Sequence, residues 1–180
     1  MKKGYNNITL GLILATFHIN LGTLQIVPTF IGWIIVAMGV DSLLKPEGQA
    51  LMNKSKKLSE ALIITSLLGL IMTALDRSIG NPYLLTIIVS LIELFFIYYF
   101  LRGVTERYMA KGKITDANEN EKILNIYIIF HIIGILIICV YWLKYSSLTG
   151  SFLAFYMMGL RIYIIYQVYK LGKLCSVEEI

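Results

Sequence analysis

Six apolar segments, each close to the length of a membrane-spanning helix, constrain this chain more than any other feature of its sequence. A helix needs about 20 mainly apolar residues to cross the hydrocarbon core of a bilayer. The segments run over residues 5–22, 28–44, 58–75, 82–101, 123–143 and 151–169. We therefore expect an all-α fold: a polytopic membrane bundle of six transmembrane helices, built as a single integral membrane domain over residues 1–180.

The composition agrees with a membrane protein. Of the 180 residues, 57% are hydrophobic and 15% are charged, and the mean hydropathy is +0.73. Soluble domains carry about 25% charged residues. Pro28 and Pro82 suit the first turn of a helix, which supports the expected starts of the second and fourth spans.

The basic residues predict the orientation. Most of the 16 lysines and arginines flank one side of the expected spans, whereas only Arg77 and Lys144 flank the other. Because basic residues gather in cytoplasmic loops, we expect both termini in the cytoplasm of a multi-pass protein of the cell membrane. The loops on the other side are short, so the helices should pair as three hairpins. We expect the polar stretch from Lys111 to Lys122 to be a solvated linker.

The second expected span carries a pattern that resembles a known family. The pattern consists of Pro28, then Phe30, Ile31 and Gly32, an aromatic residue at Trp33, and Gly39. In residues 20–44 the chain resembles the opening hairpin of an uncharacterised family of small multi-spanning membrane proteins of low-GC Gram-positive bacteria. The resemblance implies a bacterial cytoplasmic membrane protein, and the family brings no established activity.

Three ionisable residues fall near the middle of expected spans. Glu93 lies at the centre of the fourth span, Arg161 at the centre of the sixth, and His131 near the middle of the fifth. A charge at the bilayer centre costs about 2.5–3.5 kcal/mol on insertion scales, and such residues usually pair or mark a functional site. We therefore expect Glu93 and Arg161 to form an ion pair.

This pair has two interpretations, which the sequence leaves open. In the first, the pair only fixes the register of two helices in lipid. In the second, Glu93, Arg161 and His131 bind a small anionic or zwitterionic ligand, or protons. Secondary candidates are the polar residues that share helix faces with these groups or lie near span ends, namely Asp41, His18, Asp76, Ser90 and Thr86.

Small residues predict close helix packing. Gly11, Ala15, His18 and Gly22 share one face of the first span, and Gly32 with Gly39 forms a similar seam on the second. Thr86 and Ser90 share a face with Glu93, and we expect this face to meet the one formed by Thr65, Gly69, Thr73 and Asp76 on the third span.

The sequence contains few of the residue patterns that catalysis or metal binding requires. No catalytic motif is present, and neither histidine has a second ligand at helical spacing, so we predict no metal and no cofactor. The basic residues form no folded basic face, so we predict no nucleic-acid partner.

We favour a ligand-binding or transport-associated membrane component, working with a partner membrane subunit or as a homo-oligomer. One alternative is a non-catalytic immunity, stress or regulatory protein that binds a partner. A second is a membrane-embedded enzyme using Glu93 and His131.

Overall fold

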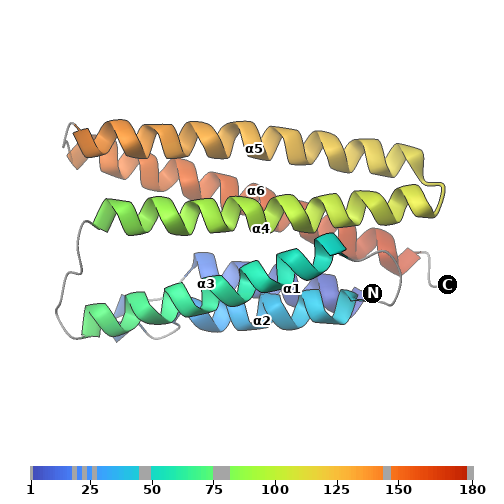
Figure 1. The fold of residues 1–180 in the computed structure, drawn as a ribbon, viewed down its shortest axis with the longest axis horizontal. Coiled ribbons are helices and arrows are strands. Elements are labelled where there is room, and N and C mark those ends of the chain that lie inside the picture. Colours follow the sequence, from blue (N-terminus) through green and yellow to red (C-terminus); the bar gives the residue numbers. More distant parts are fainter. Residues whose placement is uncertain are drawn as a thin grey trace.

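The chain folds into six helices, as the computed structural model shows for residues 2–17, 20–21, 24–25, 28–44, 50–74, 82–143 and 147–177 (Figure 1). The predicted all-helical class is confirmed. The helices are α1 (Lys2–Thr16), α2 (Thr29–Leu43), α3 (Ala50–Ala74), α4 (Pro82–Ala110), α5 (Ile114–Leu143) and α6 (Ser147–Val177). Two-residue strands, β1 (Asn20–Leu21) and β2 (Leu24–Gln25), pair antiparallel between α1 and α2.

The helices lie side by side along one long axis (Figure 1). Both chain termini lie at the same end of the bundle, which we call the terminal end; the opposite end is the distal end (Figure 1). Each helix contacts the next one in the chain, and α1 also contacts α6, so the six helices close a ring. The members of each predicted hairpin are in contact. The contact between α1 and α2 is the most extensive in the bundle, and that between α5 and α6 is the least.

Side chains of α4 fill the centre of the ring. Half of its apolar stretch is buried, against 28% for α5 and 11% for α6. The ring of Phe96 meets Trp33 of α2 edge to face at 5.5 Å, and Phe100 meets Tyr5 of α1 at 6.3 Å. Such aromatic pairs contribute about 0.5–1.5 kcal/mol beyond the area that they bury. Of the three longest apolar helices, α4 is therefore the one that buries the largest share of its apolar stretch in the bundle.

Three helices, α4, α5 and α6, are long and apolar enough to cross a membrane. At about 1.5 Å per residue, the 15 residues each of α1 and α2 extend about 22 Å, less than the hydrocarbon thickness of about 30 Å. The outward faces are strongly apolar, which suits lipid rather than water. Large exposed side chains on them include Leu10, Ile64, Leu68, Phe95, Ile129, Leu136, Phe152 and Phe155. The chain is therefore a membrane protein with three candidate spans.

Glycines bring the backbones of α1 and α2 into direct contact. A Cβ atom added at Gly32 would lie 2.6 Å from the carbonyl oxygen of Gly11 and 2.5 Å from the amide nitrogen of Ala15. A Cβ atom at Gly39 would lie 2.8 Å from the carbonyl oxygen of Gly4. The prediction that Gly11, Ala15, Gly32 and Gly39 serve close helix packing is confirmed; the structure shows in addition that the two seams face each other and that Gly4 extends the first. The other two residues of the seam on the first span, His18 and Gly22, lie outside the described residues.

The prediction of a linker from Lys111 to Lys122 is wrong. Helix α4 continues to Ala110, α5 begins at Ile114, and only a tight turn separates them. Gly112 adopts the left-handed conformation, with φ of 71°, and donates a hydrogen bond to the carbonyl of Met109, while Lys113 donates to Tyr108. This pattern satisfies the last carbonyls of α4 and lets α5 start at once. The polar residues therefore extend α5 beyond its apolar part.

Candidate functional site

The predicted contact between Glu93 and Arg161 is present and bidentate. The Nε atom of Arg161 donates to Oε1 of Glu93 at 2.9 Å, and Nη2 donates to Oε2 at 2.5 Å. Paired hydrogen bonds between a guanidinium and a carboxylate are among the strongest in proteins, and they fix the relative orientation of both groups. The pair joins the middle of α4 to the middle of α6.

The two partners differ in exposure. The Glu93 side chain is 5% exposed, whereas that of Arg161 is 31% exposed. Glu93 is therefore enclosed by the bundle, whereas the side chain of Arg161 is partly accessible. The guanidinium of Arg161 has five N–H donors, and the pair with Glu93 uses two of them.

His131 lies next to this pair on α5, but it bonds to neither member. Its Nε2 atom is 3.0 Å from the backbone carbonyl oxygen of Ser90, and its ring lies 5.0 Å from that of Tyr127. A carbonyl oxygen only accepts, so Nε2 carries the proton and Nδ1 is an acceptor. Nδ1 is buried and has no partner among the described residues. His131 thus fastens α5 to α4 one turn before Glu93.

A cavity of about 340 Å³ adjoins Arg161 on its distal side. It lies among α2, α3 and α4, and we call it the distal cavity. Five of its lining residues carry hydroxyl groups, and the remaining described residues other than Arg161 are apolar or glycine. The lining residues are Thr29, Thr65, Ser66, Gly69, Leu70, Leu85, Thr86, Val89, Ser90 and Arg161.

The distal cavity explains the two polar faces predicted on the third and fourth spans. Thr65 and Gly69 of α3 face the same space as Thr86 and Ser90 of α4, so these parts of the two faces meet, as expected. The side chain of Thr73 and the whole of Asp76 lie outside the described residues. They meet across an opening rather than in close packing, because a Cβ atom at Gly69 would find nothing within 4 Å. The arrangement places the Arg161 side chain beside hydroxyl groups, in a cavity that opens to the outer face of an apolar bundle.

The other candidates lie away from this cavity. Asp41 is at the terminal end, where its carboxylate accepts a hydrogen bond from the ammonium of Lys56 at 2.5 Å. This hydrogen bond raises the pKa of Lys56 above its usual value. Both side chains are substantially exposed, so the pair is a surface contact. His18 and Asp76 lie outside the described residues. In the described part of the chain, no group of three or more His, Cys, Asp or Glu side chains is arranged to hold a metal ion.

Two buried polar contacts near the terminal end are not evident from composition. Asn120 of α5, 2% exposed, donates through Nδ2 to the carbonyl of Leu101 and to Oγ1 of Thr105, both at 2.8 Å. Arg107 donates to the carbonyl of Leu43, near the end of α2. A signal for Asn120 exists, since it continues the helical spacing of Leu124, Tyr127 and His131.

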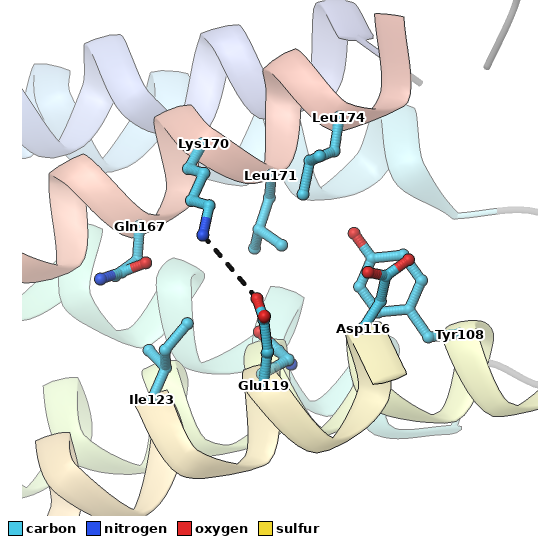
Figure 2. Close-up of a pocket in the computed structure, with 9 residues that line it drawn as sticks. Tyr108, Asp116, Glu119, Ile123, Gln167, Lys170, Leu171 and Leu174 are labelled. Carbon is cyan, nitrogen blue, oxygen red and sulfur yellow. Dashed lines mark ion pairs between the residues drawn. The ribbon is translucent and has the colours of Figure 1, made fainter. Parts of the chain in front are cut away.

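A second, much smaller space lies beside Asn120, between α5 and α6. It has a volume of about 20 Å³ and is lined in part by Asp116, Glu119, Gln167 and Lys170. Figure 2 shows the carboxylate of Glu119 facing the ammonium of Lys170 across it; the two groups are 3.8 Å apart. This volume holds about one water molecule, so it is too small for an organic ligand.

Neither a family model, nor a curated protein, nor a solved structure matches this chain. Function must therefore be inferred from the geometry and chemistry of the site.

Proposed function

We propose that this chain is a six-span integral protein of the cell membrane, with both termini in the cytoplasm, that binds a small organic anion or zwitterion in the distal cavity. One observation carries the proposal. The partly accessible side chain of Arg161 lines a cavity of about 340 Å³ that contains five hydroxyl-bearing residues and opens to the outer face of the bundle, where Leu85 is 45% exposed. A pair that served only to fix helix register would not require such a space.

The first three helices support the six-span arrangement by their packing. They lie along the same axis as α4 and expose apolar side chains such as Leu10, Met38 and Ile64 (Figure 1). Short apolar helices fit a membrane by local thinning of the bilayer. Every described lysine and arginine except Arg161 belongs to the half of the bundle near the terminal end. This distribution supports a cytoplasmic location of that end.

The charge of the site favours a ligand with one carboxylate. A guanidinium fork matches the geometry of a carboxylate or phosphate. Glu93 already balances the charge of Arg161, so a multiply charged anion would leave uncompensated charge in a medium of low dielectric constant. A zwitterion adds no net charge and a monocarboxylate adds only one, so either fits better than a multiply charged anion.

The size of the cavity further limits the class of ligand that can bind. Small-molecule sites usually measure about 300–1,000 Å³, so this cavity of about 340 Å³ lies at the lower end of that range. Hydroxyl groups such as those of Ser66 and Ser90 both donate and accept, which suits a ligand with its own hydroxyl or ammonium group. We therefore infer a small hydroxy acid or amino acid.

Binding to the purified protein in lipid nanodiscs tests this proposal. The probes are lactate, alanine and inorganic phosphate, titrated calorimetrically and by thermal unfolding. We expect lactate or alanine to bind more tightly than phosphate. At a concentration 100 times its Kd, a ligand stabilises the folded state by about 2.7 kcal/mol.

Two matched substitutions locate the site. Gly69→Leu should fill the distal cavity and abolish binding, because a Cβ atom there meets nothing within 4 Å. Gly159→Leu on α6 is equally unobstructed but does not line the cavity, so it should bind normally. Equal binding by both variants, or no binding of any probe to the unmodified protein, would contradict the proposal and favour a partner-binding role.

A further inference from the structure

Unfilled spaces border α6 at successive heights along the bundle, on more than one side of the helix. Arg161 borders the distal cavity and also a void of about 10 Å³ on its terminal side, where Ile164 lines it. One turn further, Gln167 and Lys170 border the 20 Å³ space between α5 and α6 (Figure 2). The three spaces thus occur in order from the distal to the terminal end.

Two short barriers separate these spaces. The first is the Arg161–Glu93 pair, whose members both line the 10 Å³ void. The second is about one helical turn thick, since Ile164 and Gln167 differ by roughly 4.5 Å in height along α6. Val168 lies on the face of α6 that carries Arg161 and Ile164, is fully buried, and borders neither void. It therefore belongs to the packed layer that closes the route.

The terminal end of the α5–α6 contact is weakly held. The Glu119–Lys170 pair spans 3.8 Å between side chains that are 61% and 49% exposed. Exposed ion pairs of this kind contribute little to stability. The α5–α6 contact is also the least extensive between neighbouring helices, and only 11% of the apolar stretch of α6 is buried.

A ligand at Arg161 would act directly on the strongest polar contact of α6. An anion in the distal cavity competes with Glu93 for the same guanidinium, and so weakens the contact between α6 and α4. Once this contact is weakened, α6 is held by α1 and α5, and its contact with α5, the less extensive of the two, can open at the end that Glu119 and Lys170 close. Alternate opening on the two sides of a fixed midplane site is the general scheme of secondary transport.

We propose that the protein moves its ligand across the membrane along α6, with the Arg161–Glu93 pair as the midplane barrier and the Glu119–Lys170 pair as the gate at the terminal end. This inference rests on the proposed function and goes beyond it, since it requires the buried face of α6 to become accessible to water.

Cysteine accessibility tests the route without knowledge of the ligand. In a full-length protein with Cys139 and Cys175 replaced by alanine, Val168→Cys is compared with Val40→Cys. Both valines are fully buried, but Val40 lies on α2, in the tightly packed seam with α1. The probe is a positively charged, membrane-impermeant methanethiosulfonate, applied to each side of sealed vesicles.

We expect Val168→Cys to react from the terminal side at least tenfold faster than Val40→Cys. Glu119→Lys, which places like charges opposite Lys170, should raise the rate at Val168→Cys several-fold. Glu121→Lys is the control, because Glu121 pairs with Arg102 and does not border the void; it should leave the rate unchanged. If Val168→Cys is as unreactive as Val40→Cys, or both react equally, translocation along α6 is wrong. The proposed ligand binding is tested separately, by the comparison of Gly69→Leu with Gly159→Leu, and does not depend on this result.

Discussion

Two contacts hold this bundle together in opposite ways: the glycine seam between α1 and α2, and the ion pair between α4 and α6. In the seam, a Cβ atom on Gly32 would come within 2.6 Å of backbone atoms of the neighbouring helix. No space remains beside it. The Glu93–Arg161 pair instead uses two long polar side chains and has a cavity of about 340 Å³ next to it.

The difference separates a permanent contact from an exchangeable one. Lipid provides no hydrophobic force between helices, so membrane helices associate through close packing and polar contacts. Backbone packing has no partner that a ligand can replace. A guanidinium can exchange one carboxylate for another, and this makes Arg161, rather than the seam, the place for function.

Removal of one charge of the ion pair should have the largest effect on stability. Arg161→Gln leaves Glu93 buried without its partner, and breaking a buried pair in this way costs about 3–5 kcal/mol. We expect the lower end of this range, because Arg161 is 31% exposed. The loss in the free energy of unfolding is measured by equilibrium unfolding in SDS, monitored by the fluorescence of the buried Trp33. The double variant Glu93→Gln/Arg161→Gln should regain most of the loss; additive losses would show that the two groups do not depend on each other.

A single methyl group in the seam should have the next largest effect. Gly32→Ala forces α1 and α2 apart, since the new Cβ atom would lie 2.5 Å from the amide nitrogen of Ala15. Overpacking of this kind costs about 1–3 kcal/mol. The same unfolding assay measures the loss, and ligand binding at a concentration well above Kd should be unchanged. A variant as stable as the parent would show that the seam is not as close as described.

The same substitution should change stability in the opposite direction where an added Cβ atom would meet open space. At Gly69 and Gly159 a Cβ atom meets nothing within 4 Å. Alanine there removes only the entropic disadvantage of glycine in a helix and should stabilise by about 0.5–1 kcal/mol. Destabilisation at Gly69 would mean that the distal cavity is smaller than described.

The smallest effect is expected at the terminal surface. Asp41→Asn removes the contact with Lys56, and exposed pairs contribute about 0.2–1 kcal/mol. The loss should shrink further in high salt, because ions screen exposed charges. Ligand affinity should not change, as Asp41 is far along α2 from the distal cavity. A salt-independent loss of more than 2 kcal/mol would contradict this description of Asp41.

Prediction from the sequence was most accurate for residues whose placement in lipid costs free energy. The contact between Glu93 and Arg161 could be predicted from the sequence, because each charge costs free energy in lipid and both residues lie at the middle of a span. Close packing at Gly11 and Gly32 follows similarly from the spacing of small residues. The distal cavity could not be predicted, since the same stripe of Thr65, Gly69 and Thr86 suits two helices in tight contact.

Prediction failed where polar residues continue a helix. The stretch from Lys111 to Lys122 has the composition of a linker, but Gly112 turns the chain so sharply that α5 starts two residues later. Asn120 then finds buried partners on α4, which composition alone cannot show. The continuous helical spacing from Asn120 to His131 indicates a helix, and it was a better guide to the structure than the polar composition of the stretch.

The exchange of the two charges tests the central claim most directly. In Glu93→Arg/Arg161→Glu, the ion pair can re-form, so the protein should fold with most of its stability. The guanidinium then originates from α4 at the enclosed position and no longer borders the distal cavity, so binding of lactate and alanine should fall at least tenfold. A folded double variant that binds these probes as tightly as the unmodified protein would contradict the assignment of Arg161 as the ligand-binding group.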